Sequence, residues 1–314
     1  MDILLILEKN KGTIWAHAAL FLVNTLYGAS HVLAKGVMPT YLTPSVFILF
    51  RVLGAAFLFW LILFFMKSFK IERKDWLRLA GCGLFGVTVN QLFFFHGLNL
   101  SSSVNSGIIM AFNPIMVIIL SGFLLREKIT PVHLTGIAIG AIGAILLTLT
   151  GVRSVSETSL GDLFLLINSL SYAVYLVLAK PLMKKYSPLL VITWVFTIGL
   201  GFLLLYPPVL SEFIVTDFTV IPTSIWLKIA YVVVGVTFLT YLLTMYGLKH
   251  LSPSVSSSYI YFQPMMVIGF AYLFLYLNLA PDYTSTITWE KIIYMLLIFV
   301  GVYLTGKPTR KTNS

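Results

Sequence analysis

Three short segments of this 314-residue chain recur about 150 residues later and in the same order. Val-Leu-Ala-Lys at 32–35 returns at 177–180, Gly-Val-Thr at 86–88 returns at 235–237, and Asn-Pro-Ile-Met-Val-Ile at 113–118 returns as Gln-Pro-Met-Met-Val-Ile at 263–268. Chance rarely preserves both the residues and their order. The chain therefore consists of two copies of one unit.

The composition identifies the medium that these copies occupy. Hydrophobic residues make up 59% of the chain and charged residues 10%, and the mean hydropathy is +0.95. A soluble domain has roughly 25% charged residues, so this sequence predicts an all-α integral membrane protein in a lipid bilayer. Apolar runs of about 20 residues, enough to cross the hydrocarbon core, fall at 14–34, 45–66, 76–97, 104–125, 131–150, 160–180, 188–209, 226–248, 254–278 and 289–306.

Each copy holds five of these ten predicted spans, which gives halves at 14–150 and 160–306. A unit that crosses the bilayer an odd number of times leaves the chain on the opposite side. The second copy must then be inverted relative to the first. Inverted repeats are the architecture from which many secondary transporters build alternating access, with the substrate site between the repeats.

The basic residues indicate the orientation. With the N-terminus inside, 16 of the 21 Lys and Arg residues fall on the cytoplasmic side and four on the far side, while Arg51 lies within a span. This asymmetry follows the positive-inside rule and predicts that both termini are cytoplasmic. Because the basic residues lie at span ends, the net charge of +10 does not indicate a nucleic-acid partner.

Several function classes lack their expected residues. Cys82 is the single cysteine, which excludes an internal disulfide and a cysteine-rich metal site. No His-Glu-x-x-His motif or intramembrane acid pair supports an enzyme, and no ring of like charges supports a channel. We expect no cofactor and no catalytic residue, and a carrier of small solutes is favoured over a channel or passive facilitator.

Polar residues form a stripe on the first and sixth predicted spans. His17, Asn24 and His31 recur at spacings of seven, which places them on one helical face. Asn168 and Tyr175 each lie 144 residues after Asn24 and His31. A polar stripe facing lipid would be costly, so both stripes should face the protein interior, either as packing partners between helices or as the lining of a shared cavity.

Two further pairs of spans carry matched polar residues. Gln91 and Tyr241 lie near the middle of the third and eighth spans. Asn113 and Gln263 each precede a proline, which leaves one backbone carbonyl without its helical partner. The resulting kink is either a hinge at a cavity wall or a static bend, and Tyr259 lies one turn before Gln263 on the same face.

Arg51 stands within the second span, where a guanidinium stays charged. It either binds a substrate carboxylate or phosphate, or extends outward to the interface.

The source of energy for transport stays open, because only His31 and His96 could relay protons deep in the membrane. Gly136, Gly140 and Gly143 line one side of the fifth span and predict close helix packing, either within the chain or across a homodimer.

The chain resembles the EamA family of the drug/metabolite transporter superfamily over nearly its whole length. The resemblance rests on Leu-Tyr-Gly-Ala at 26–29, Arg51, and the segment 86–147 with its Gln-Leu-Phe-Phe-Phe, Ser-Ser-Ser, Asn-Pro and Arg-Glu-Lys (Glu127) elements. It implies a permease of the bacterial inner membrane that exports small metabolites such as amino acids through a central cavity. The acidic turn at Glu127 has no clear match after the ninth span.

Together these observations predict a substrate-binding cavity between the two copies. We expect ten residues to line it: Asn24, His31, Arg51, Gln91, Asn113, Asn168, Tyr175, Tyr241, Tyr259 and Gln263.

Overall fold

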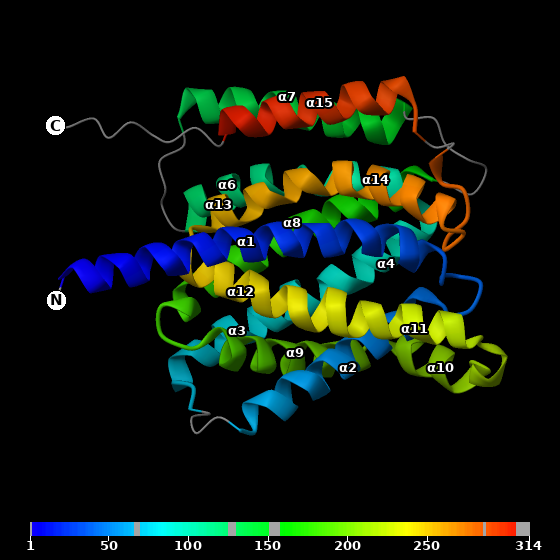
Figure 1. The fold of residues 1–314 in the computed structure, drawn as a ribbon, viewed down its shortest axis with the longest axis horizontal. Helices are drawn as coiled ribbons and strands as arrows, with labels where there is room; N and C mark the ends of the chain where they lie inside the picture. Colours follow the sequence, from blue (N-terminus) through cyan, green and yellow to red (C-terminus); the bar gives the residue numbers. More distant parts are fainter. Residues whose placement is uncertain (1, 66–69, 125–129, 151–157, 285–286, 306–314) are drawn as a thin grey trace.

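The computed structural model describes residues 2–65, 70–124, 130–150, 158–284 and 287–305, with the side chains of these residues except 2–11, 144, 147–150, 302 and 305. These residues form helices and connecting turns, with no strand among them (Figure 1). Six helical segments are long and apolar enough to cross a membrane, and a bent pair would make a seventh. Phe57, Phe64 and Phe123 are among the many large apolar side chains on the outer surface, as expected for a protein surrounded by lipid.

The α-helices follow one another along the chain with short connections. Their bounds are α1 Asp2–Lys35, α2 Pro44–Leu63, α3 Trp76–Gly83, α4 Asn90–Leu100, α5 Ser103–Met110, α6 Asn113–Leu124, α7 Pro131–Thr150, α8 Ser159–Met183, α9 Pro188–Leu204, α10 Pro207–Val215, α11 Thr223–Tyr231, α12 Thr240–His250, α13 Pro253–Ser258, α14 Phe262–Tyr276 and α15 Trp289–Thr305. Glu127 lies outside the described residues.

Several helices begin at equivalent positions of the two copies with the same cap. The hydroxyls of Thr43 and Ser187 accept a backbone N–H three residues later and start α2 and α9, each followed by proline. Ser102 and Ser252 start α5 and α13 in the same way. A capping oxygen satisfies one of the backbone N–H groups that a helix start leaves unpaired. The duplication thus extends from sequence to local structure.

The repeated Gly-Val-Thr segment forms a wide helical turn in both copies. A π-helical stretch at Leu84–Val89 joins α3 to α4, and another at Val232–Leu239 joins α11 to α12. In the second copy the Thr237 hydroxyl donates to the carbonyl of Val232 at 2.8 Å, five residues earlier. Such single-turn π-bulges are frequent at functional sites.

The repeated lysine of Val-Leu-Ala-Lys closes the end of a neighbouring helix in each copy. Lys35 Nζ donates to the carbonyls of Leu98 and Asn99 at 2.8 and 2.9 Å, at the end of α4. Lys180 Nζ donates to the carbonyl of Leu248 at 2.6 Å, at the end of α12. An ammonium at a helix C-terminus satisfies unpaired carbonyls and complements the helix dipole.

Breaks interrupt three of the predicted spans. Before Pro114 the chain turns between α5 and α6, and before Pro264 a short 3₁₀ turn at Tyr259–Tyr261 joins α13 to α14. Proline supplies no N–H to the preceding turn, so each break has a local cause. The predicted span 188–209 is divided between two helices, because α9 ends at Leu204 and α10 begins at Pro207 at a bend of 77°.

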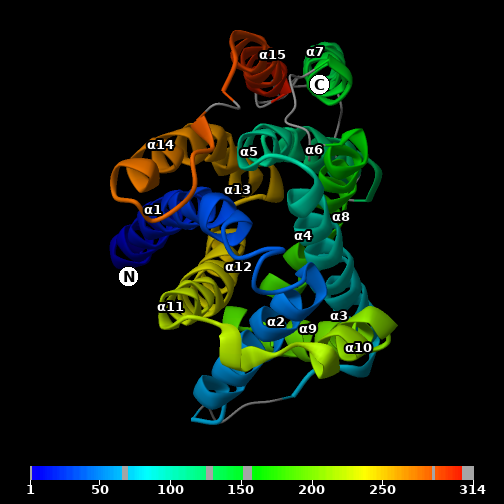
Figure 2. The ribbon, with the colours of Figure 1, turned by 90° about the vertical axis from the view of Figure 1, so that its right-hand side faces the viewer.

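Helices α7 and α15 form a layer of their own, seen at the top of Figure 2. The two helices pack against each other, and the predicted glycine face of α7 meets Gly301 of α15. Gly143 lies against the α15 side chains of Leu297 and Ile298. The glycine face therefore joins two helices within the chain.

Candidate functional site

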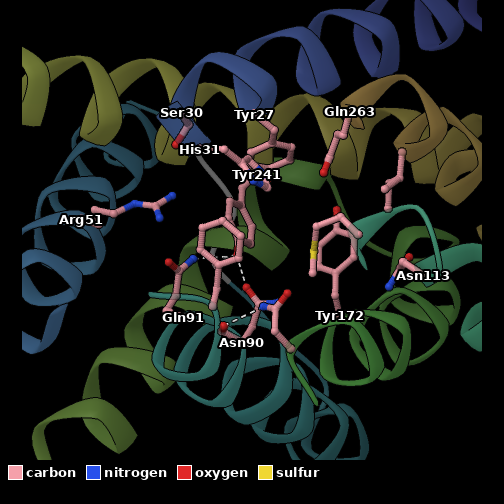
Figure 3. A pocket seen from close by; sticks show the side chains of 14 residues that line it. Tyr27, Ser30, His31, Arg51, Asn90, Gln91, Asn113, Tyr172, Tyr241 and Gln263 are labelled. Carbon is pink, nitrogen blue, oxygen red and sulfur yellow. Dashed lines mark hydrogen bonds between the residues drawn. The ribbon is translucent and has the colours of Figure 1, made fainter. Parts of the chain in front are cut away.

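A cavity lies between helices of both copies, with an empty volume of about 530 Å³ counting its open part. Its walls come from α1, α2, α4, α5, α6, α8, α12 and α14 and the turn before α14, and Figure 3 shows the side chains pointing inward. The lining residues are Tyr27, Ser30, His31, Arg51, Asn90, Gln91, Phe94, Met110, Asn113, Asn168, Tyr172, Tyr241, Ile260 and Gln263.

The seam between the copies is held by a hydrogen-bonded bridge inside this cavity. Gln91 Nε2 donates to the Tyr241 hydroxyl at 2.9 Å, and these two residues occupy equivalent positions of the repeat. The Tyr241 hydroxyl lies 2.9 Å from the carbonyl of Gly86 and 3.2 Å from Asn90 Oδ1, either of which can accept its proton. The Gly86 carbonyl belongs to the π-helical stretch, so the wide turn exposes an acceptor that a tyrosine of the other copy then satisfies.

Amide side chains fasten the remaining walls to one another. Asn168 Nδ2 donates to the carbonyl of Asn90 at 2.7 Å, and Asn113 Nδ2 donates to that of Ser169 at 2.6 Å. Gln263 Nε2 donates to Asn24 Oδ1 at 2.8 Å. Each bond joins different helices, which fixes the direction in which the amide points.

His31 is buried on α1 and forms a hydrogen bond with a side chain of α5. Its Nδ1 lies 2.5 Å from the Ser106 hydroxyl, which itself donates to the carbonyl of Ser103 at 2.7 Å. Because a hydroxyl donates one proton, the imidazole Nδ1–H must donate to Ser106. The Nε2 atom of a neutral His31 is then a hydrogen-bond acceptor.

Arg51 is 3% exposed and reaches into the cavity from α2. Its Nε donates to the Thr237 hydroxyl of the second π-helical stretch at 2.8 Å, and its guanidinium carbon lies 4.4 Å from the centre of the Phe95 ring. The interface-seeking alternative for this side chain does not fit these inward contacts. No Asp or Glu is among the described residues that line the cavity.

Seven of the ten predicted site residues line the cavity, and three lie elsewhere. Asn24 is buried beneath the wall, where its oxygen accepts from Gln263. Tyr175 is fully buried with its ring packed on Gly86, so closely that a Cβ at Gly86 would lie 2.4 Å from the ring. Tyr259 is partly exposed and bonds His17 at 2.6 Å. The seven are His31, Arg51, Gln91, Asn113, Asn168, Tyr241 and Gln263.

Seven lining residues were absent from the predicted set. Tyr27 and Tyr172 belong to the polar stripes of α1 and α8, and Asn90 is adjacent to Gln91, so a polar or aromatic signal was present for these three. Ser30, Phe94, Met110 and Ile260 carry no signal that separates them from ordinary membrane-helix residues. Their place in the lining depends on how the helices pack.

Comparison with known proteins relates both halves of the chain to one family of transporters. The model of the EamA-like transporter family matches residues 14–149 and again 159–307. A Bacillus subtilis protein named as the uncharacterized transporter YyaM is 29% identical over 251 residues, which cover 78% of this chain and 81% of that protein. An uncharacterized transporter of Archaeoglobus fulgidus is 25% identical over 75% of this chain and 78% of its own length.

Two further proteins match nearly the whole of this chain. A chloroplastic WAT1-related protein of Arabidopsis thaliana is 24% identical over 96% of this chain and 72% of its own. A solved crystal structure superimposes with a TM-score of 0.62 at 18% identity, covering 95% of this chain and 97% of that one, and shares the fold.

The apolar helices, the cavity lined by polar side chains and these relatives define a multi-pass membrane transporter of the drug/metabolite kind, which indicates a transporter rather than an enzyme. With both halves matched, the chain belongs to the EamA-like transporter family.

Proposed function

We propose that this transporter carries a small metabolite, such as an amino acid, out of the cell by alternating access. The observation that supports this most is that one polar cavity draws its walls from both family-matched segments. Equivalent residues of the two copies, Gln91 with Tyr241 and Asn113 with Gln263, face the same space. A site at the seam of two repeats can be opened alternately to either side when one repeat moves against the other.

The proposed architecture is ten crossings in two inverted halves, at 14–150 and 160–306, in a bacterial inner membrane with both termini cytoplasmic. In Figure 1, α1 begins and α15 ends at the same end of the bundle, which supports an even number of crossings. A homodimer would need a surface other than the glycine face of α7, because α15 covers that face.

The proposed substrate contacts are the seven predicted residues that line the cavity. Asn24 has a supporting role, because it holds Gln263 in place. We assign Tyr175 and Tyr259 to packing and to the α1 contact through His17.

The experiment is counterflow transport in proteoliposomes with the full-length chain and a panel of labelled amino acids and nucleosides. We expect saturable uptake of at least one compound, reduced at least tenfold by Gln91→Ala. The matched control is Gly269→Ala on the outer surface of α14, where a Cβ would meet no atom within 4 Å. Flux that rises linearly with concentration, or single-channel currents in a planar bilayer, would overturn the proposal of a carrier in favour of a channel.

A further inference from the structure

Arg51 offers most of its hydrogen-bonding capacity to the cavity. A guanidinium has five N–H donors, and only Nε is used, by Thr237. Within the described part of the chain, neither Nη group has a hydrogen-bond partner and no carboxylate pairs with the charge. A buried cation in this state strongly favours an anion that presents two oxygens to its fork.

The repeat shows that packing alone does not require a cation at this position. Thr43 and Ser187 are equivalent caps, so the counterpart of Arg51 is Val195, 144 residues later. Val195 is fully buried. The second copy thus has an apolar side chain at this position, and the first copy has a permanent positive charge. The charge therefore lies on only one side of the cavity.

The opposite side of the cavity presents acceptors. Asn113 and Gln263 use their amide nitrogens in bonds to other helices. Their side-chain oxygens are buried without a hydrogen-bond partner among the described residues. Figure 3 places both residues across the cavity from Arg51. Leaving a buried acceptor unpaired is unfavourable, and a hydrogen-bond donor on a ligand would remove that cost.

The middle of the cavity is lined by aromatic side chains. The rings of Tyr27, Tyr172 and Tyr241 lie between Arg51 and the two amides (Figure 3). Aromatic faces pack well against planar or extended apolar groups. From Arg51, the lining therefore runs through aromatic side chains to the unpaired acceptors of Asn113 and Gln263, and Gln91 Oε1 is a further buried acceptor without a partner among the described residues.

We propose that the cavity binds an elongated organic monoanion whose carboxylate pairs with Arg51 and whose far end donates a hydrogen bond to Asn113 and Gln263. A carboxylate is favoured over a phosphate because one negative charge neutralises one guanidinium, whereas a dianion would leave a net charge buried. This inference rests on the proposed transport function and narrows its substrate class.

The test uses isothermal titration of the purified full-length chain in detergent with matched synthetic probes. The probes are 4-hydroxybenzoate, 4-hydroxyphenylacetate and 3-(4-hydroxyphenyl)propionate, the primary amide of each, and the same acids without the ring hydroxyl. We expect the best hydroxy acid to bind at least tenfold more tightly than its amide and about three- to tenfold more tightly than the acid without the hydroxyl.

Variants then assign the charge preference to its residue. Arg51→Gln should weaken binding of the best acid at least tenfold and change binding of its amide less than threefold. Arg51→Val, the residue of the second copy, should behave in the same way, and Arg51→Lys should lose less. The matched control is Arg78→Gln, which removes an exposed cation from α3 and should change nothing.

The comparison of acid with amide on the unaltered protein keeps the test valid if a variant does not fold. Equal affinity for acids and amides, including no binding of either, would overturn the monoanion assignment. Tight binding of the acid that persists in Arg51→Gln would also overturn it. Binding without transport in proteoliposomes would reject the proposed function and leave the site assignment intact, whereas transport of neutral solutes alone would do the reverse.

Discussion

Replacing Gly301 by alanine should separate the α7–α15 layer. A Cβ on Gly301 would lie 2.5 Å from the backbone nitrogen of Gly140, 2.7 Å from its Cα and 2.6 Å from the carbonyl oxygen of Gly136. Ordinary van der Waals contacts begin at 3.4 Å. All three obstructing atoms belong to the backbone, so no side-chain rotation relieves the clash and the helices must move apart by close to 1 Å.

The expected cost follows from two opposing effects. Overpacking of a close interface typically destabilises a protein by about 1–3 kcal/mol. Alanine in place of glycine within a helix contributes about 0.5–1 kcal/mol in the other direction. Gly269→Ala in α14 receives the second effect alone, because nothing lies within 4 Å of the added Cβ. The difference between the two variants therefore isolates the steric cost, which we expect to be about 1–3 kcal/mol.

The assay is reversible unfolding in mixed micelles, followed by tryptophan fluorescence and circular dichroism on Gly301→Ala, Gly269→Ala and the unaltered chain. Gly301→Ala should be the least stable of the three. Ligand affinity of its folded fraction should be unchanged, because neither α7 nor α15 contributes a residue to the cavity. If Gly301→Ala proves as stable as Gly269→Ala, the close approach of α7 and α15 is wrong.

Two other predictions concern the seam and the topology. Tyr241→Phe removes the hydroxyl that accepts from Gln91 and donates toward Gly86 and Asn90, and it should destabilise the chain by about 1–3 kcal/mol through the orphaned groups. The unfolding assay described for Gly301→Ala measures this loss, and unchanged stability of Tyr241→Phe would contradict the hydrogen-bonded bridge. For topology, single cysteines in a Cys82→Ser background should react with an impermeant maleimide from the cytoplasm at Lys249→Cys and from outside at Lys228→Cys. Labelling of both from the same side would show that the segment between them does not cross the membrane, which would refute the proposed ten crossings.

Much of the architecture was readable from local sequence patterns. Apolar runs placed the helices, because a segment in lipid must satisfy its own backbone hydrogen bonds. The recurring Ser and Thr caps, the prolines and the repeated Gly-Val-Thr gave the two copies equivalent starts, breaks and wide turns. These features depend on residues within a few positions of one another, and duplication preserves them.

The lining of the cavity depended on contacts between distant segments. Tyr172 and Tyr175 are both tyrosines of α8 and lie one turn apart, yet the first lines the cavity and the second packs on Gly86. Both were compatible with a polar stripe, because helical periodicity gives a face only to within a wide arc. The exact rotation of α8 is set by the helices that pack around it.

By itself, the sequence determined that this chain is a duplicated helical membrane protein with polar groups turned inward. Composition and periodicity act through the bilayer, which penalises every unpaired polar group in the same way wherever it occurs along the chain. Only the tertiary structure decided that Arg51 meets Thr237 and Phe95, and that Asn113 and Gln263 face it across the cavity. Those pairings join residues up to about 200 positions apart, and their geometry comes from packing between helices that no local pattern specifies.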